Sequence, residues 1–570
     1  MRRFCLAALL LLLMTGCTQA GAPSRTQGTP SSSATSDTAT DRTRTLVIAI
    51  RVEPISLAYK QQARGVTLTT TLRLFNANLV LFNQRGQPVP YLASQLPQLN
   101  TDTWQVSPDG HMETTYKLKP NLVWHDGEPL TADDFVFSWR AFTTSGLGTP
   151  NSPPDSLIDE VVAPDPLTVT VRWKRPYYDA GILSDQFPPL PKHILDSALQ
   201  TSTPEVFAAN SYWTQDYIGA GPFRLDRWEP GAFIEATAFN RHVLGAPKIG
   251  RVRIIFIGDP NTTLANLLAG EVQFSADDSI RFEQGLTLQR EWGPTGGSVL
   301  VKPSLWRSSY VQFRPELLAT PGLADRRVRK ALALTMDKQG LNQALFEGQG
   351  IMSDVPFVPS TVDYFSAIEP MVTRYQYDLA RAQSLLTDAG FARGADGVWA
   401  SPSAGRLSFG LTTTSSSQNE SELSILGASW RQAGFEVSES VLPVAQAQDG
   451  QARSSFPGLF TFSTPLGEDT LAAQTTIAMP RPENRWIGFN RGGWSSPQFD
   501  RIADEFNGTL DQQQRVKLIG EMLQIYTEEV PALPLYFNPI PVAHVAALHG
   551  PQTVAPESDI AWNVYEWELR

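Results

Sequence analysis

The side chains that most often carry out chemistry, those of cysteine and histidine, are scarce in this chain of 570 residues. It has two cysteines, Cys5 and Cys17, and six histidines. The closest histidines, His544 and His549, are five residues apart, which is a poor spacing for one face of a helix. The sequence contains neither a G-x-S-x-G elbow nor an H-E-x-x-H pair. We therefore expect that the protein is not an enzyme and has neither a metal site nor a cofactor. A catalytic pair of carboxylates that only folding brings together is not visible in a sequence, so that alternative stays open.

Cys17 is the one reactive side chain whose surroundings suggest a reaction. Arg2 and Arg3 precede an apolar run over residues 5–14, which has the length of a signal peptide and is too short to span a bilayer. The segment MTGC, from Met14 to Cys17, resembles the lipobox of bacterial lipoproteins. That motif usually has Leu at the place of Met14. The resemblance implies cleavage before Cys17 and acylation of its thiol with diacylglycerol. The alternative is an ordinary secretory signal with an accidental cysteine.

The residues after Cys17 predict a tether rather than a folded domain. Residues 18–44 are rich in Ser, Thr, Ala, Gly and Pro and contain almost no large apolar side chain, so they cannot form a core. The rest of the chain suits a globular body, since 42% of all residues are hydrophobic and 18% are charged. The net charge of −11 argues against nucleic acid as a partner, because phosphates would repel such a protein.

Local signals along the body predict alternating strands and helices. Residues 45–54 form a β-rich run that ends in proline. Thr131 and Asp134 have the spacing of a capping box at the start of an amphipathic helix. Such alternation is typical of the α/β class.

The stretch over residues 251–276 predicts a βαβ unit. A strand over 251–257 is followed by a helix that starts at Asp259-Pro260 and ends at Gly270, and a second strand follows. We expect Leu264, Leu267 and Leu268 to form the buried stripe of this helix. Ser496 followed by Pro497 predicts the start of another helix in the second half of the chain.

Six segments in this order resemble the large solute-binding proteins of ABC importers, the branch that carries oligopeptides, dipeptides and nickel. They are WHDGEPLTADDFVFSW, GAGPFRLDRWEPG, DPNTTLANLLAGEV, DRRVRKALALTMDKQGL, YDLARAQSLLTDAGF and GGWSSPQFDRIADEF, and they span about residues 46 to 540. The resemblance implies a two-lobed clamshell with an extra subdomain in lobe I and the ligand between the lobes. We accordingly expect a signal peptide at 1–16, the lipidated cysteine and linker at 17–45, lobe I at 46–75, 218–303 and 538–570, the extra subdomain at 76–217, and lobe II at 304–537.

The resemblance also implies where a ligand would bind. Peptide-binding relatives hold the peptide amine with an aspartate in a lobe II motif resembling A-D-Y-x-x-P. The corresponding stretch here is residues 458–474, and at the expected place it has Phe462, Ser463 and Thr464 without an aspartate. The nearest acids, Glu468 and Asp469, would substitute for it or belong to a solvated turn.

Other candidate ligand contacts lie close to these segments in the implied fold. Glu53, after the first strand, is the best alternative acid, and its bland interpretation is a surface charge before a proline. Arg485 and Arg491 would pair with a ligand carboxylate or remain exposed loop residues. Four aromatic residues would line the cleft or belong to the core; they are Trp306, Tyr310, Trp486 and Trp494.

These observations predict a monomeric, lipid-anchored protein on the outer face of the bacterial cell membrane. It would capture a peptide or peptide-like solute and deliver it to ABC permease subunits. Two alternatives keep the same fold: a non-peptide ligand such as an oligosaccharide, haem or a metal chelate, or a ligand-sensing lipoprotein. An exported hydrolase is disfavoured, because no catalytic motif is present.

Overall fold

The computed structural model describes residues 44–59, 68–147, 154–443, 446, 449–484, 486 and 488–570. The predicted signal peptide, Cys17 and the linker up to residue 43 lie outside these ranges, and so does Arg485. The described residues from Arg44 to Arg570 form one compact unit. None of the helices within the described ranges has the length and hydropathy needed to cross a membrane.

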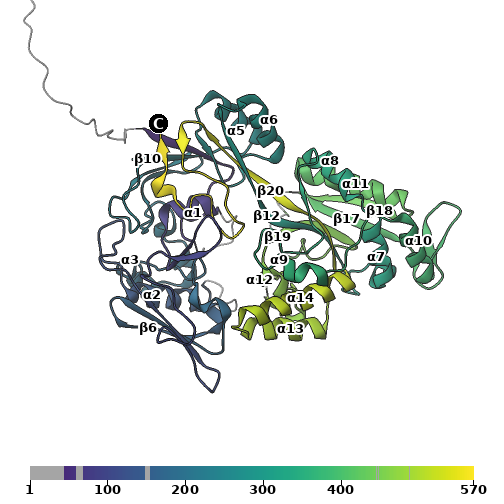
Figure 1. Cartoon of the computed structure of the whole chain (residues 1–570), viewed down its shortest axis with the longest axis horizontal. Coiled ribbons are helices and arrows are strands. Elements are labelled where there is room, and N and C mark those ends of the chain that lie inside the picture. Colours follow the sequence, from purple (N-terminus) through teal and green to yellow (C-terminus); the bar gives the residue numbers. More distant parts are fainter. Residues whose placement is uncertain are drawn as a thin grey trace, which may run out of the picture. The chain divides into compact units, whose positions relative to one another are not determined.

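One large mixed sheet forms the centre of the structure (Figure 1). Its strand order is β18-β17-β19-β12-β20-β11-β1-β10-β9-β8, and the short β13 pairs with β20 at the side. The bounds are β1 (Thr45–Ile50), β8 (Phe223–Glu229), β9 (Phe233–Ala238), β10 (Arg251–Phe256), β11 (Phe274–Ser275), β12 (Gly297–Val311), β13 (Ile351–Met352), β17 (Ser408–Thr414), β18 (Glu436–Leu442), β19 (Leu459–Pro465) and β20 (Ala532–Val545).

The two longest strands, β12 and β20, join the two halves of this sheet. They pair with each other along nearly their whole length, and the register shifts between Pro303 and Leu305. At this shift Pro303 faces Pro539, and proline cannot donate a ladder hydrogen bond. The ladder is therefore interrupted where the predicted lobe boundaries, 303/304 and 537/538, cross the two strands. These boundaries stay a prediction.

The predicted βαβ unit is confirmed. Strands β10 and β11 both pair with β1 in parallel, and α5 (Pro260–Ala269) connects them. Asp259 caps this helix and Gly270 ends it in the left-handed conformation with φ of 75°. The predicted stripe is wrong at Leu268, which is 43% exposed, whereas Leu267 is buried. The helix packs on the sheet through fewer residues than the leucine spacing indicates.

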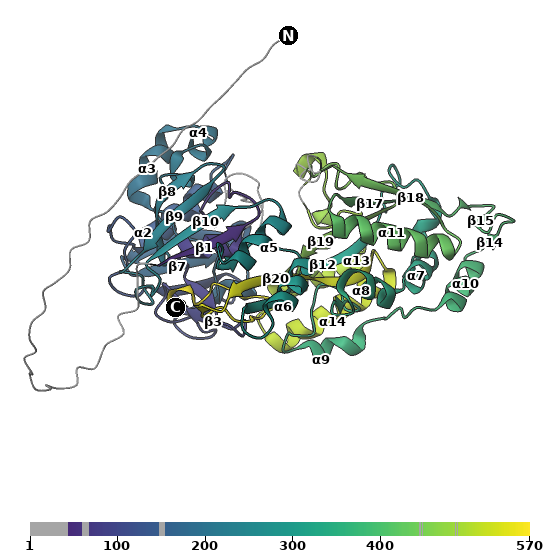
Figure 2. The same cartoon turned by 90° about the horizontal axis from the view of Figure 1, so that it is seen from above.

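Helices cover both faces of the sheet around β12 and β19. Neighbouring residues of a strand point to opposite faces, and Arg307 contacts Glu422 of α11 whereas Trp306 contacts Tyr526 of α14. One group of helices comprises α7 (Arg326–Leu334), α8 (Lys338–Phe346), α10 (Leu379–Asp388) and α11 (Ser417–Gln432), and the other comprises α9 (Phe365–Ile368), α12 (Glu468–Ala472), α13 (Pro497–Gly508) and α14 (Gln512–Glu529) (Figures 1 and 2).

A separate four-stranded sheet lies within residues 76–217, where we expect the extra subdomain. Its order is β4-β5-β7-β6, and the predicted capping box of Thr131 and Asp134 starts the helix α2 beside it. The cap of α13 by Ser496, with Pro497 at the first position, is likewise confirmed. The elements of this region are β4 (Trp104–Val106), β5 (Met112–Lys117), α2 (Ala132–Thr143), β6 (Ile158–Asp165), β7 (Thr168–Trp173), α3 (Lys192–Thr201) and α4 (Pro204–Ala208).

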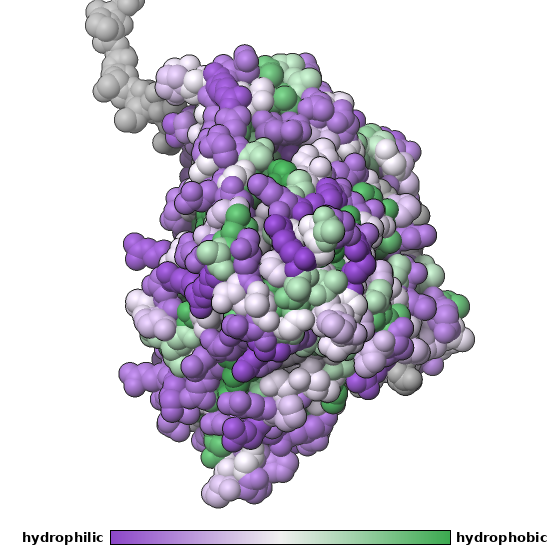
Figure 3. Space-filling view, turned by 90° about the vertical axis from the view of Figure 1, so that its right-hand side faces the viewer, coloured by the Kyte–Doolittle hydropathy of each residue, from purple (hydrophilic) through white to green (hydrophobic). Residues whose placement is uncertain are grey.

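Smaller elements complete the chain. On the face seen in Figure 3, hydrophobic residues lie scattered among hydrophilic ones. That face therefore gives no sign of a docking surface. The remaining elements are α1 (Thr69–Phe75), β2 (Val80–Phe82), β3 (Pro88–Pro90), α6 (Phe282–Trp292), β14 (Ala392–Arg393), β15 (Trp399–Ser401), β16 (Gly405–Arg406), β21 (Leu548–His549), β22 (Glu568–Leu569) and several single turns of 3-10 helix.

Candidate functional site

Strand β19 has one edge that is only partly paired. It pairs with β12 along its whole length, but its pairing with β17 ends at Phe460. The carbonyl oxygen of Thr461 accepts a hydrogen bond from Thr413 Oγ1 (3.0 Å). Beyond that point, up to Pro465, no strand of the described chain pairs with this edge. An unpaired edge of this kind is a template for an added strand, such as an extended peptide.

The unpaired edge contains the three residues that the resemblance to peptide-binding proteins implies as ligand contacts. Ser463 is half-buried, whereas Phe462 and Thr464 are buried. The Phe462 ring stacks on Tyr310 with 4.5 Å between ring centroids. These buried side chains leave the backbone as the part of the edge that an added strand would meet. Their contact with a ligand stays a prediction.

Three of the predicted aromatic residues lie in the core beneath this edge. Trp306 is fully buried, and its indole Nε1 donates to Ser353 Oγ at 3.0 Å. Tyr310 and Trp494 are also buried, and Trp494 packs against Phe499. The structure therefore gives these side chains a packing role, and their predicted contact with a ligand is untested.

Trp486 and Glu53 have different surroundings. Trp486 is half-buried and has a φ of 60°, which is uncommon for a bulky residue. Glu53 accepts hydrogen bonds from Trp228 Nε1 (2.7 Å) and from the backbone N–H of Gly231 (2.9 Å). Both carboxylate oxygens of Glu53 thus have partners within the protein, which accounts for this acid without a ligand. Its role in binding stays a prediction.

A group of carboxylates lies just past the end of β19. Glu468, at the start of α12, accepts a hydrogen bond from Tyr364 Oη (2.7 Å) and lies 3.9 Å from Arg515. Asp469 and Asp179 have no hydrogen bond or ion pair of their side chains with any described residue. Asp179 belongs to the 3-10 turn Tyr178–Gly181, far away in sequence.

The surroundings of these acids shift their pKa values. Burial and the negative charge of Glu468 raise the pKa of Asp179 to about 7, although the Arg515 cation acts in the opposite direction. Desolvation by surrounding atoms raises the pKa of Asp469 to about 6, although this residue stays exposed on one side. Burial and both aspartates raise the pKa of Tyr177. The site thus groups Glu468, Asp179 and Asp469 near the Arg515 cation, which pairs with Glu468.

Contacts between residues 175–178 and the α13–α14 pair hold the two sides of this acidic group together. Arg175 Nη1 lies 2.8 Å from an oxygen of Asp504, and the Tyr178 ring contacts Phe506 with 5.0 Å between centroids. The Arg515 guanidinium lies 4.5 Å from the centre of the Tyr178 ring. The sequence offered Glu468 and Asp469 as candidates, but no local signal marks Asp179, because only folding brings residues 290 positions apart together.

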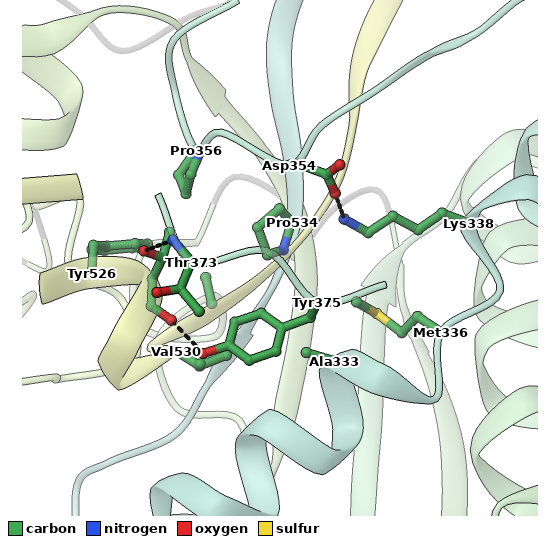
Figure 4. Close-up of a pocket in the computed structure, with 12 residues that line it drawn as sticks. Ala333, Met336, Lys338, Asp354, Pro356, Thr373, Tyr375, Tyr526, Val530 and Pro534 are labelled. Carbon is green, nitrogen blue, oxygen red and sulfur yellow. Dashed lines mark hydrogen bonds and ion pairs between the residues drawn. The ribbon is translucent and has the colours of Figure 1, made fainter. Parts of the chain in front are cut away.

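The pocket in Figure 4 is not part of the unpaired edge of β19, and it is too small for a peptide. It lies beside the Lys338–Asp354 ion pair (2.8 Å) and the hydrogen bond from Tyr375 Oη to the carbonyl oxygen of Thr527. Its volume of about 10 Å³ is the lower limit for one water molecule. Within the described ranges there is also no group of three or more His, Cys, Asp or Glu side chains that could hold a metal ion.

The sheet joined by two long strands and the half-open edge of β19 define a two-lobed α/β binding protein. Two solved structures share this fold over 92% of the chain. One is NikZ from Campylobacter jejuni in complex with Ni(L-His), with a TM-score of 0.73, 23% identity and 99% of that chain covered. The other is the oligopeptide-binding protein AppA from Bacillus subtilis in complex with a nonapeptide, with a TM-score of 0.70, 19% identity and 99% covered. The predicted fold class is confirmed.

The family follows from the sequence itself. Residues 95–467 match the bacterial extracellular solute-binding proteins, family 5. The chain belongs to this family, as its six segments predict. A putative ABC transporter peptide-binding protein from Brucella ovis is 27% identical over 289 residues. This match covers 51% of each protein, so the chain spans about half the length of that relative.

Proposed function

We propose that the protein is a lipid-anchored solute-binding protein that captures a peptide or peptide-like solute between two lobes and delivers it to an ABC importer. Membership of the solute-binding family supports binding and transport. The nonapeptide bound by AppA and the name of the Brucella relative favour peptides as the ligand class. The observation that carries the proposal is the unpaired edge of β19, which is followed directly by the acidic group of Glu468, Asp469 and Asp179.

The two features would recognise two parts of a peptide. The backbone of an extended peptide pairs with the free N–H and C=O groups of β19, which gives affinity with little dependence on side chains. Asp179 and Asp469 then pair with the peptide ammonium group. A charge-assisted hydrogen bond of this kind contributes about 1.5–3 kcal/mol, so this acid pair would take over the role of the aspartate that is missing from residues 462–464.

The anchor rests on the sequence alone. Acylation of Cys17, followed by the flexible linker up to residue 45, would hold the body at the outer face of the cell membrane. There it would meet the permease subunits. Closure of the two lobes around the hinge near Pro303 would signal the loaded state, because the solute contacts both lobes only when they are closed.

Binding of defined solutes tests this function. We would titrate the exported, purified full-length protein by calorimetry with trialanine, N-acetyl-trialanine, maltotriose and the nickel–histidine complex. We expect trialanine to bind and N-acetylation to weaken binding by about 10–100-fold, because the acetyl group removes the ammonium charge. Binding of maltotriose or the nickel complex without any peptide would contradict the proposal in favour of a non-peptide solute.

A variant pair locates the binding. Asp179→Asn should lower the affinity for trialanine by about 10–100-fold and leave that for N-acetyl-trialanine unchanged. The matched control is Asp102→Asn, because Asp102 is exposed in a turn. An unchanged affinity in Asp179→Asn would remove the acid pair from the site. A ligand-sensing role would instead show as peptide binding without stimulation of the importer's ATPase.

A further inference from the structure

An open groove lies where the described chain begins. Its volume is about 490 Å³, which is within the range of small-molecule sites. Two arginines line it, Arg44 and Arg570, together with the apolar residues Val545, Ala547 and Leu569. Guanidinium groups bind phosphate well, and apolar side chains bind hydrocarbon. A lining of both kinds therefore suits an amphiphile that carries an anionic group.

Further cations lie beside this groove. Strand β10 starts at Arg251, next to the start of β1. Arg251 is exposed, and its side chain makes no hydrogen bond or ion pair with any described residue. Lys248 lies three residues earlier, and its Nζ is 2.7 Å from a carboxylate oxygen of Glu568. We call Arg44, Lys248, Arg251 and Arg570 the basic edge.

The carboxylates beside the basic edge are too few to neutralise it. Glu568 serves two cations, since Arg570 Nη2 also lies 2.8 Å from one of its oxygens. Hydrogen bonds from Lys248 and Arg570 lower the pKa of Glu568 to about 2. Glu271 is exposed next to the groove-lining Gly270. Even if the chain ends in a free carboxylate at Arg570, positive charges outnumber negative ones here, although the whole chain carries −11.

The basic edge is separate from the site proposed for the peptide. Strands β1 and β10 are parallel, and both begin at this edge. Open α/β sheets bind their solutes outside the opposite, carboxyl ends of such strands. The acidic group of Asp179, Glu468 and Asp469 also belongs to other elements. The basic edge therefore calls for a different partner.

The chain before Arg44 indicates which partner this is. The composition of residues 18–44 predicts a coil, and a coil of that length spans roughly 30 Å. With Cys17 acylated, the edge that is joined directly to this coil stays close to the lipid surface. Anionic phospholipids attract Lys and Arg side chains near that surface and repel the acidic remainder of the body. Charge complementarity thus favours contact through the basic edge.

We propose that the basic edge binds the phosphate groups of anionic phospholipids and holds the body against the membrane. This inference rests on the anchor in the proposed function and goes beyond it, because it adds a second contact with the lipid. The guanidinium groups of Arg44 and Arg570 would bind a phosphate through parallel N–H donors, and the apolar lining would contact the glycerol. Salt should weaken the contact, because the Debye length falls from about 10 Å at 0.1 M to about 3 Å at 1 M.

Vesicle co-sedimentation tests the proposal. It uses the chain from residue 18 onward, which lacks the lipid and keeps the whole compact unit. Vesicles of pure phosphatidylcholine are compared with vesicles of phosphatidylcholine and phosphatidylglycerol in equal parts. We expect binding to the anionic vesicles at low salt, its loss at about 1 M salt, and no binding to the neutral vesicles.

A matched pair of double variants locates the contact. Lys248→Gln with Arg251→Gln should weaken binding to the anionic vesicles about 25-fold, because each lost cation weakens it about five-fold. The control is Arg85→Gln with Lys517→Gln, which removes the same charges from exposed positions elsewhere and should bind like the wild type. Thermal unfolding checks that each variant folds.

The outcomes separate this inference from the function beneath it. Equal binding to both kinds of vesicle, or equal weakening in the control, overturns the inference and leaves peptide binding intact. If inorganic phosphate raises the melting temperature of the wild type but not of Arg44→Gln with Arg570→Gln, and anionic vesicles do not bind, the groove binds free phosphate and the lipid assignment is wrong. The anchor itself is tested separately, by membrane fractionation of Cys17→Ala, so its failure and that of the basic edge give different results.

Discussion

The strongest electrostatic prediction concerns Asp179. Its pKa is raised from 3.8 to about 7 by burial and by the Glu468 charge. Each pKa unit corresponds to 1.36 kcal/mol, so ionising Asp179 in the folded protein costs about 4 kcal/mol. Because Asp179 is only half-buried, we expect about 2–4 kcal/mol after allowing for solvent screening.

The sign of the effect follows from proton binding. Between pH 4 and 7 the unfolded chain has lost the Asp179 proton while the folded protein still holds it, so stability falls as the pH rises. Asp179→Asn removes this loss. The free energy of unfolding of the variant minus that of the wild type should be near zero at pH 4 and about 2–4 kcal/mol at pH 8. Asp469, with its pKa near 6, affects both proteins alike.

Urea unfolding followed by tryptophan fluorescence, from pH 4 to pH 8, measures this difference. Asp102→Asn is the control and should match the wild type at every pH. Saturating trialanine should reduce the difference at pH 8, because its ammonium group stabilises the ionised Asp179. A difference that does not change with pH, or a variant that is less stable at pH 8, would refute the reasoning.

Three further predictions concern other parts of the chain. Glu422→Gln, which breaks the fully buried pair with Arg307, should lower the free energy of unfolding by about 3–5 kcal/mol, and a loss below 1 kcal/mol in urea unfolding would contradict the pair's importance. Glu53→Gln should lower the free energy of unfolding by about 1–3 kcal/mol, because the NH₂ of the amide cannot accept the hydrogen bond that Trp228 or Gly231 donates. The affinity for trialanine should stay unchanged, and a tenfold weaker affinity by calorimetry would place Glu53 in the binding site instead. Cys17→Ala should move the protein from the membrane fraction to the soluble fraction on immunoblots, and unchanged membrane association would argue against the anchor.

Features that depend on neighbours in the sequence were predicted well. The capping box at Thr131 and the βαβ unit from 251 to 276 follow from spacing within one or two turns of chain, and the structure confirms both. Leu268 was wrong, because the leucine pattern of α5 does not say how much of the helix the sheet covers. The family could also be predicted from the sequence, because the segments that resemble it are mainly turns and helix starts that determine the fold.

Only some residues of the candidate site could be predicted from the sequence. Phe462, Ser463 and Thr464 were placed by resemblance, and Glu468 and Asp469 by their nearness in the chain. Nothing local connects Asp179 with them, because only folding brings residues 290 positions apart together. The sequence likewise could not tell a core tryptophan from one at a cleft, and Trp306 lies in the core.

The central claim is that the protein carries a peptide or peptide-like solute. Mass spectrometry of the protein purified gently from a bacterial host, first native and then denatured, tests it most directly. The account predicts that denaturation releases a family of peptides with unmodified amino ends. Release of a single non-peptide mass, or of peptides blocked at the amino end, would contradict it.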